Sequence, residues 1–126
     1  ERGDEWLDEN KAPGKDFLGT TCLQWESSVQ KISTLNKRVV LLRTGIVLSN
    51  EGGALPPLVR PLYFGIAPIF GNGHQYYPWI HIDDVCRIYL HAVLNESMSG
   101  AYNTTAPEPE QYIDLMNQLA STLGKC

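Results

Sequence analysis

The sequence lacks a long apolar run, an excess of positive charge and a signal-peptide pattern. No apolar stretch approaches the roughly 20 residues that a membrane span needs. The net charge of -4 argues against binding to nucleic acid or to an anionic membrane, because phosphate contacts need clustered Lys and Arg. The acidic start of the chain has none of the features of a secretory leader. We therefore expect no nucleic-acid partner and no membrane partner.

Cysteine is also scarce, and the three that occur are scattered along the chain: Cys22, Cys86 and Cys126. An odd, scattered set does not form a disulfide framework. Two of them fall on predicted helices, where we expect buried thiols. Such thiols suit a reducing cytoplasm, so the sequence predicts a cytoplasmic protein.

What is present is a globular composition, with 43% hydrophobic and 19% charged residues over 126 positions. Such a chain can bury a core and form one domain. A helix is expected from the N-cap Asp16 to about Leu35. Its apolar residues recur at steps of three and four, which predicts one inward-facing side. These residues are Leu18, Cys22, Trp25, Val29 and Ile32.

The segment Arg38–Leu48 is dense in Val, Leu and Ile with little polar alternation. This pattern predicts one strand buried on both faces, as in a parallel sheet. Gly45 lies inside it, where a glycine weakens a strand and indicates that something approaches the backbone closely. A bulge or tight packing on a helix would explain the glycine equally well.

Further helices and strands alternate along the rest of the chain, which favours an α/β fold. We expect a short helix at 54–64, a strand at 76–81, a helix at 83–95, a strand at 100–106 and a last helix from Pro109. The last helix should face inward with Tyr112, Leu115, Met116, Leu119 and Leu123. These strands are too few to flank a buried one, so the chain resembles a piece of a larger sheet. A small complete α+β domain is the alternative.

The stretch "GNGHQYYPWIHIDDV" at 71–85 gathers many residues that could carry chemistry. Its two glycines precede aromatic residues and no helix, so they predict a turn and not a phosphate loop. Its His and Asp side chains are of metal-ligand type, but Asp83 stands where a helix N-cap is wanted. We expect no metal site. The aromatic strand after the turn either lines a cleft or forms a plain edge strand.

Four motifs in order carry a family resemblance: "RVVLLRTGIVLS", "GGALPPLVRPLYFG", "GNGHQYYPWIHIDDVCRIYLHAV" and "GAYNTTAPEP". They resemble the C-terminal part of an extended short-chain dehydrogenase/reductase. More narrowly, they are similar to the atypical "epimerase family" branch, usually labelled nucleoside-diphosphate-sugar epimerase. "ERGDEWLDE" and "DFLGTTCLQWE" resemble the segment of that branch after the central active-site strand.

The resemblance implies the C-terminal part of a Rossmann-type parallel sheet with a small substrate-side lobe. Residues 1–126 would form one partial domain without the glycine-rich N-terminal half. The full-length protein would bind NAD or NADP, with NADP slightly favoured, and this chain alone should hold neither. The strand end Thr44, Gly45, Ile46 and Val47 matches the segment that lies against the nicotinamide. The residues that match the substrate enclosure are Leu55, Pro56, Gln75, Tyr77, Trp79 and His81.

Two departures from the family pattern bear on activity. The wider family uses Tyr-x-x-x-Lys for proton exchange, and here Leu18 and Cys22 stand at those places. No catalytic residue can therefore be assigned, and the chain alone is expected to be inactive. Tyr77 stands where an Arg grips the diphosphate of a nucleotide sugar, and a phenol is a poor substitute for a guanidinium fork. A smaller or more aromatic ligand is favoured.

The sequence thus leaves three functions open. The first is the substrate-side part of an NAD(P)-dependent epimerase or oxidoreductase acting on a small molecule. The second is a catalytically silent dinucleotide-binding or regulatory module. The third is an inactive fragment that self-associates into a homo-oligomer through an exposed sheet edge.

Overall fold

The structure, a computed structural model, describes residues 2–125 apart from the side chain of Ser33. Glu1 and Cys126 lie outside the described residues. The helices are α1 (Phe17–Gln30), α2 (Leu55–Leu62), α3 (Ile82–Leu94) and α4 (Tyr112–Thr122), with a 3-10 turn η1 (Lys31–Leu35) after α1. The strands are β1 (Val40–Thr44), β2 (Ile46–Ser49), β3 (Gly52–Gly53), β4 (Tyr76–Tyr77), β5 (Trp79–His81), β6 (Gly100–Thr104) and β7 (Glu110–Gln111).

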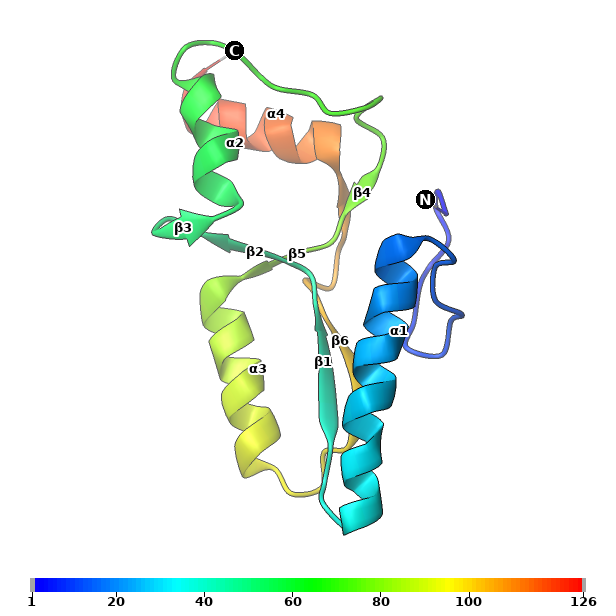
Figure 1. The fold of residues 1–126 in the computed structure, drawn as a ribbon. Helices are drawn as coiled ribbons and strands as arrows, with labels where there is room; N and C mark the ends of the chain where they lie inside the picture. The colour runs from blue at the N-terminus through cyan, green and yellow to red at the C-terminus, as the bar shows by residue number, and fades with distance from the viewer. Residues whose placement is uncertain (1, 126) are drawn as a thin grey trace.

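The strands pair mainly in parallel, as predicted for a Rossmann-type α/β fold. β1 pairs with β6 and β2 pairs with β5, both in parallel, while β3 is antiparallel to β2 and β4 is antiparallel to β7. Figure 1 shows β1 and β6 between α1 and α3, and a second part built by α2, α4 and β4. β2 and β5 cross between the two parts (Figure 1). The expected small lobe is therefore the part formed around α2 and α4.

The apolar segment predicted as one strand is two strands that belong to different sheets. Up to Gly45 the backbone pairs with β6, and the Gly45 N–H donates to the Thr104 carbonyl at 3.0 Å. At Ile46 the partner changes, and the Ile46 N–H donates to the Pro78 carbonyl at 2.7 Å. The expectation of burial on both faces is wrong as well, because β1 is half-buried and in β2 only Leu48 is fully buried. Residue periodicity identifies an extended segment but not the point at which it changes partners.

The aromatic strand predicted at 76–81 is also divided, at Pro78. Proline has no backbone N–H, so it cannot donate to a ladder and is confined to strand ends and edges. Before it, β4 pairs with β7 in the small lobe, and after it β5 pairs with β2. The neighbouring side chains Tyr77 and Trp79 therefore belong to different parts of the fold.

The helix α3 begins at Ile82, one residue before the predicted start at Asp83, and its N-cap is His81. The His81 Nδ1 accepts a hydrogen bond from the Asp83 N–H at 3.2 Å. The prediction of Asp83 as the N-cap is therefore wrong. Asp83 and Asp84 lie in the first turn, where their charge favours the positive end of the helix dipole.

The small lobe contains the main hydrophobic core of the described chain. α2 and α4 bring together Leu58, Leu62, Tyr112 and Met116, with Tyr77, Leu119, Ala120 and Leu123 packed against them. This confirms the inward face predicted for the last helix. The helix itself begins at Tyr112, three residues after the proline expected to start it. Core packing thus ties the lobe to the aromatic strand β4.

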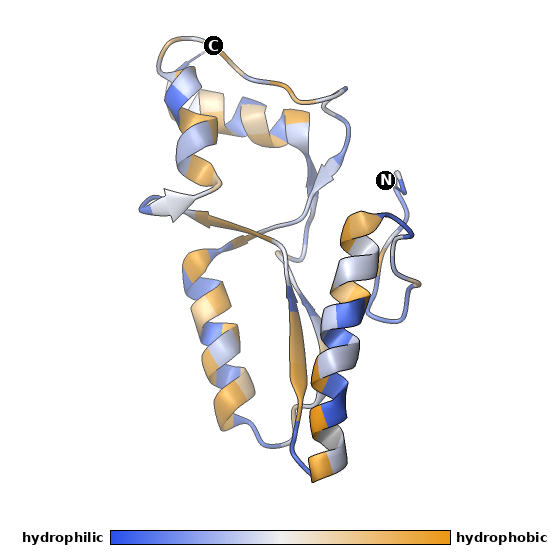
Figure 2. Cartoon of the chain, viewed as in Figure 1, coloured by the Kyte–Doolittle hydropathy of each residue, from blue (hydrophilic) through white to orange (hydrophobic). Residues whose placement is uncertain are grey.

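The predicted inward face of α1 is exposed, which corrects the expectation. Leu18 and Trp25 are each 68% exposed, and α1 has no buried residue. Cys22 and Cys86 are free and exposed, so the prediction of buried thiols is wrong too. Figure 2 shows apolar residues along α1 with no other helix over them. Periodicity predicts that one face of a helix is apolar, but it does not predict whether another element packs against that face.

None of the helices described in the structure combines the length and the apolar character required to cross a membrane. The turn predicted at Gly71 and Gly73 is present, since both residues have positive φ, at 61° and 78°. The Gly73 N–H donates to the Phe70 carbonyl across this turn at 3.2 Å.

Candidate functional site

Two strands at the crossing of the fold bring the predicted cofactor segment beside part of the predicted substrate pocket. In the parallel pair of β2 and β5, Ile46 lies opposite Trp79 and Leu48 lies opposite His81. Both strands run in the same direction, and ligands of α/β proteins bind beyond the carboxyl ends of such strands. This pairing makes the crossing our candidate functional site.

Gly45 is required at this crossing by the chain's own atoms. A Cβ at this position would lie 2.4 Å from the Pro78 carbonyl oxygen and 2.9 Å from the Thr105 Cγ2. Both distances are too short for real carbon contacts. The close approach predicted from the sequence is therefore made by a neighbouring segment of the protein. It permits the backbone to leave β6 and join β5 within one residue.

A pocket of about 380 Å³ lies beside the crossing. Its lining includes Trp79 and His81 from β5, one face of α3, and Thr105–Pro107 after β6. The Trp79 Nε1 is buried and has no hydrogen-bond partner among the described residues. An indole N–H of this kind can donate one hydrogen bond to a ligand acceptor.

Charged groups from α3 lie at the same pocket. Asp84 and Arg87 line it, and the Arg87 Nη1 lies 3.0 Å from the Asp84 Oδ1. Both side chains are more than half exposed, so this pair contributes little to stability. Either charged side chain can therefore leave this pair and bind a polar group of a ligand. The sequence patterns did not single out Arg87 or Thr105, although both fall within the family motifs.

Tyr77 faces away from this pocket and into the small lobe. Its ring centroid lies 5.5 Å from that of Tyr112, at an interplanar angle of 50°. The Tyr112 hydroxyl donates to the Pro68 carbonyl at 2.9 Å. Burial raises the pKa of Tyr77, and burial together with the neighbouring Tyr77 raises the pKa of Tyr112. At neutral pH both phenols are uncharged packing groups.

The remaining predicted pocket residues belong to the small lobe. The Gln75 Nε2 donates to the Phe70 carbonyl at 2.9 Å, and its backbone carbonyl accepts from the Tyr112 N–H at 3.0 Å. Leu55 and Pro56 form the first turn of α2, which packs against β2. The structure therefore gathers Trp79 and His81 at one pocket and assigns the other four residues to the lobe or its boundary.

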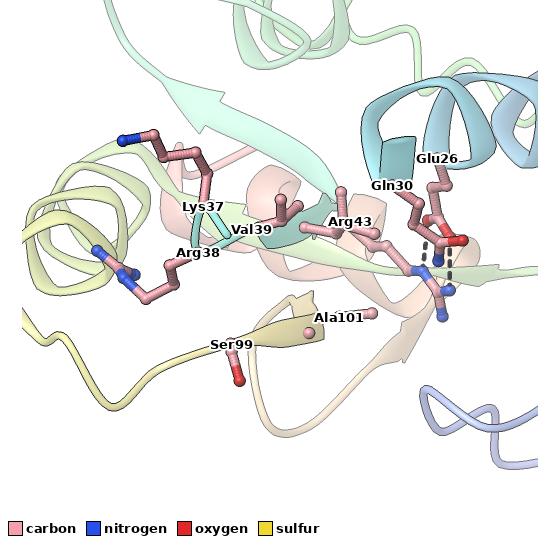
Figure 3. Close-up of a pocket in the computed structure, with 10 residues that line it drawn as sticks. Glu26, Gln30, Lys37, Arg38, Val39, Arg43, Ser99 and Ala101 are labelled. Atoms are coloured by element: carbon pink, nitrogen blue, oxygen red, sulfur yellow. Dashed lines mark hydrogen bonds and ion pairs between the residues drawn. The ribbon is translucent and has the colours of Figure 1, made fainter. Parts of the chain in front are cut away.

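A second pocket, of about 460 Å³, lies between the end of α1 and the pair β1–β6. Figure 3 shows Arg43 reaching Glu26 across it. The Arg43 Nε lies 2.7 Å from the Glu26 Oε1, and its Nη2 lies 2.8 Å from Oε2, so the pair is bidentate. The hydrogen bond from Arg43 lowers the pKa of Glu26 and raises that of Arg43.

Sequence reasoning did not predict this ion pair, although the sequence contains a signal for it. Arg43 interrupts an apolar strand, and a charged residue in such a place needs a partner. The Arg43 Nη1 also donates to the Glu9 carbonyl at 2.9 Å. The pair therefore anchors α1 and the N-terminal segment on β1, and we assign it to architecture.

Other charged and thiol groups do not assemble into a centre. Within residues 2–125, no group of three or more His, Cys, Asp and Glu side chains could hold a metal ion. Leu18 and Cys22, at the places of the family's Tyr and Lys, lie on the exposed surface of α1. Neither side chain can serve as the phenol or the amine of that mechanism.

Among curated proteins, the chain is similar to several that are named epimerase family proteins. No protein-family model matches it. An epimerase family protein of Staphylococcus saprophyticus is 43% identical over 110 residues, which is 87% of this chain and 36% of that protein. The chain thus spans about a third of the length of this curated relative.

Solved structures give the same picture. The nucleoside-diphosphate sugar epimerase from Corynebacterium glutamicum superposes with a TM-score of 0.87 at 40% identity, covering 96% of this chain and 26% of that one. The human epimerase family protein SDR39U1 (isoform 2), solved with NADPH, has a TM-score of 0.81 at 30% identity. The superposed region covers 94% of this chain and 40% of the human chain.

Proposed function

Because this chain belongs to the epimerase family branch of the extended short-chain dehydrogenases/reductases, as a C-terminal part, we propose that it forms the substrate side of an NAD(P)-dependent protein. The reaction class is epimerase- or oxidoreductase-like, and residues 1–126 are one partial domain. The observation that carries the proposal is the parallel pairing of β2 with β5. It sets the strand end at 44–47 beside a pocket lined by Trp79, whose buried indole N–H has no partner among the described residues.

In this proposal the backbone of Thr44–Val47 lies against the nicotinamide. One side of Gly45 is closed by Pro78 and Thr105, so the ring would approach from the side of the exposed Thr44. Thr44 pairs with Thr104, which directly precedes the pocket-lining residue Thr105. When bound, the cofactor supplies hydride transfer, and this chain's residues hold and orient it. NADP is slightly favoured over NAD, which fits the NADPH of the human relative.

The proposed substrate is a small molecule enclosed by the crossing and the small lobe, where the six residues from Leu55 to His81 match the family. Tyr77 stands where the family has an Arg, so the bidentate hydrogen bonds of a guanidinium to a diphosphate are absent. Tyr77 is packed against Tyr112, and burial raises its pKa, so the phenol is uncharged at neutral pH. A ligand smaller or more aromatic than a nucleotide sugar suits this arrangement. The Trp79 Nε1 would donate to an acceptor on it.

Calorimetric titration of the full-length protein with NADPH and NADH tests the proposal. We expect one of the two to bind, and the isolated residues 1–126 to bind neither tightly, because they carry no glycine-rich phosphate loop. If neither cofactor binds the full-length protein, the proposal is wrong.

The substrate side is tested separately with Trp79→Phe, which retains an aromatic ring but removes the N–H donor. We expect weaker substrate binding with cofactor binding unchanged. Phe64→Leu, on a residue that is 83% exposed and outside the pocket, is the control. Equal substrate affinity in the Trp79 variant and the control would remove Trp79 from the site.

A second candidate function is a catalytically silent dinucleotide-binding or regulatory module. It is favoured by Leu18 and Cys22, which supply neither a phenol nor an amine at the family's catalytic places. Under this function the protein binds cofactor and turns nothing over. Steady turnover of any nucleotide sugar, carbonyl or quinone with NADPH or NADH would exclude it.

A third candidate is a self-associating fragment without activity, located in the cytoplasm, where the exposed thiols Cys22 and Cys86 stay reduced. β1 and β6 form a sheet of two strands, and a free strand edge invites pairing with a second chain. Light scattering of the 126-residue chain should then give a mass above 14.1 kDa. A monomer that is folded at all concentrations would rule this out.

A further inference from the structure

The sheet of β1 and β6 has two outer edges, and the edge along β6 is partly covered by the N-terminal segment. The Gly100 N–H donates to the Val39 carbonyl at 3.0 Å, and the Thr104 carbonyl accepts from the Gly45 N–H at 3.0 Å. Alternate residues of a strand direct their backbone groups to opposite edges. Ala101 and Asn103 therefore direct theirs away from β1. Their N–H groups would pair with any strand that joined β6.

At Asn103 this free edge is occupied by the protein's own N-terminal segment. The Asn103 N–H donates to the Glu9 Oε1 at 2.7 Å. The Asn103 side-chain Nδ2 donates to the Leu7 carbonyl at 3.0 Å. The Glu9 carboxylate thus takes the place that a carbonyl of a neighbouring strand would take.

The segment is also held from β1. The Glu9 carbonyl accepts from the Arg43 Nη1 at 2.9 Å, and Arg43 is in turn fixed by its bidentate pair with Glu26. The hydrogen bond from the Asn103 backbone lowers the pKa of Glu9, so its carboxyl is ionised at neutral pH. A hydrogen bond to an ionised acceptor is stronger than one between neutral groups.

We propose that residues 7–9 form an edge-sealing strap, which closes β6 against a β-strand from a second copy of this chain. An unpaired strand edge is a template for pairing, and proteins protect such edges with charged groups and covering loops. The strap carries both devices at one residue, Glu9. It follows that association through this sheet is directed to the edge of β1, and that β6 becomes available only when the strap detaches.

The experiment compares three variants of the full 126-residue chain by backbone hydrogen exchange and light scattering. Glu9→Ala removes the acceptor, and Glu9→Gln retains an amide oxygen at the same place. Glu5→Ala is the matched control, because Glu5 is an acid of the same segment whose ion pairs are with Arg2 and Lys11. Circular dichroism confirms that each variant is folded.

We expect the Asn103 amide to exchange on the order of tenfold faster in Glu9→Ala, since the open state is then more populated. It should keep most of its protection in Glu9→Gln and all of it in Glu5→Ala. The average mass at matched concentration should rise in Glu9→Ala alone. Equal Asn103 exchange in Glu9→Ala and the wild type would overturn the strap. Faster exchange without any rise in mass would overturn its role against strand pairing.

Discussion

At the residue scale, Gly45 has the most restricted position at the candidate site. It lies between strands that belong to different sheets, and a Cβ at this position would collide with the Pro78 carbonyl. The chain can change partners here only because no side chain is present. The same residue is the one that the sequence singles out within an apolar strand.

Gly45→Ala should therefore destabilise the fold. The added methyl would lie 2.4 Å from the Pro78 oxygen, and overpacking of this kind costs about 1–3 kcal/mol. Urea denaturation measures the loss. Gly52→Ala is the control, because a Cβ there meets nothing within 4 Å. Equal midpoints for the two variants would contradict the argument.

Tyr77 and Tyr112 set the response of the small lobe to alkaline pH. Both folded-state pKa values are raised by burial, so the folded state holds the phenol protons more tightly than the unfolded state. This contribution to stability is complete below about pH 10, the unfolded value, and is lost as the pH rises through the folded values. We expect the urea midpoint to fall as the pH rises above about 10, and to fall less in Tyr77→Phe. An identical fall in the variant would exclude Tyr77.

At the element scale, α1 is held mainly by polar contacts, since its apolar residues are exposed. The Arg43–Glu26 pair links it to β1, and both side chains are partly exposed, at 37% and 22%. Exposed pairs contribute up to about 1 kcal/mol. The attachment of α1 is consequently weaker than that of α4, which contributes Tyr112, Leu115 and Met116 to buried positions.

Acid should release α1 before the small lobe unfolds. Arg43 lowers the folded-state pKa of Glu26 below 4.5, so the stabilisation is present above that pH and is lost as the pH falls through the folded value. Hydrogen exchange of Phe17–Gln30 should quicken on acidification relative to α4, after correction for the intrinsic rate. Glu26→Gln should show the faster exchange already at pH 7. Uniform behaviour of α1 and α4 in the variant would contradict this prediction.

At the scale of the whole molecule, the chain exposes more surface than a compact protein of its size. Its accessible surface is 9149 Å², whereas a compact monomer of this mass exposes about 6,700 Å². Large apolar side chains are part of the excess, among them Phe17, Trp25, Phe64 and Leu94. The chain spans 36% of its Staphylococcus saprophyticus relative, and an open surface of this kind fits part of a larger sheet protein.

The 126-residue chain should therefore bind a hydrophobic dye strongly while it is folded. Exposed apolar surface raises the fluorescence of such dyes. The measurement compares the chain at neutral pH with a compact protein of equal mass and with the chain in urea. Fluorescence no greater than that of the compact protein would show that the apolar faces are covered in solution.

Neighbouring residues and motif order were enough to predict part of the local structure and the family resemblance. Helical periodicity predicted α3 and α4, and the order of four motifs indicated a Rossmann-type fold that the comparisons confirm. These properties depend on neighbouring residues or on motif order, so they can be read along the chain. The glycines at 71 and 73 predicted a turn for the same reason.

The tertiary structure alone decided which partners the elements take. Nothing local in "RTGIV" shows that Thr44 pairs with β6 and Ile46 with β5. Nothing local shows that Tyr77 packs against Tyr112 while Trp79 lines a different pocket. Strand pairing and burial depend on residues far apart in the sequence. The apolar pattern of α1 predicts an apolar helix face but does not show which element packs against it. The contact of Glu9 with Asn103, across 94 positions, is of the same kind and exists only in the fold.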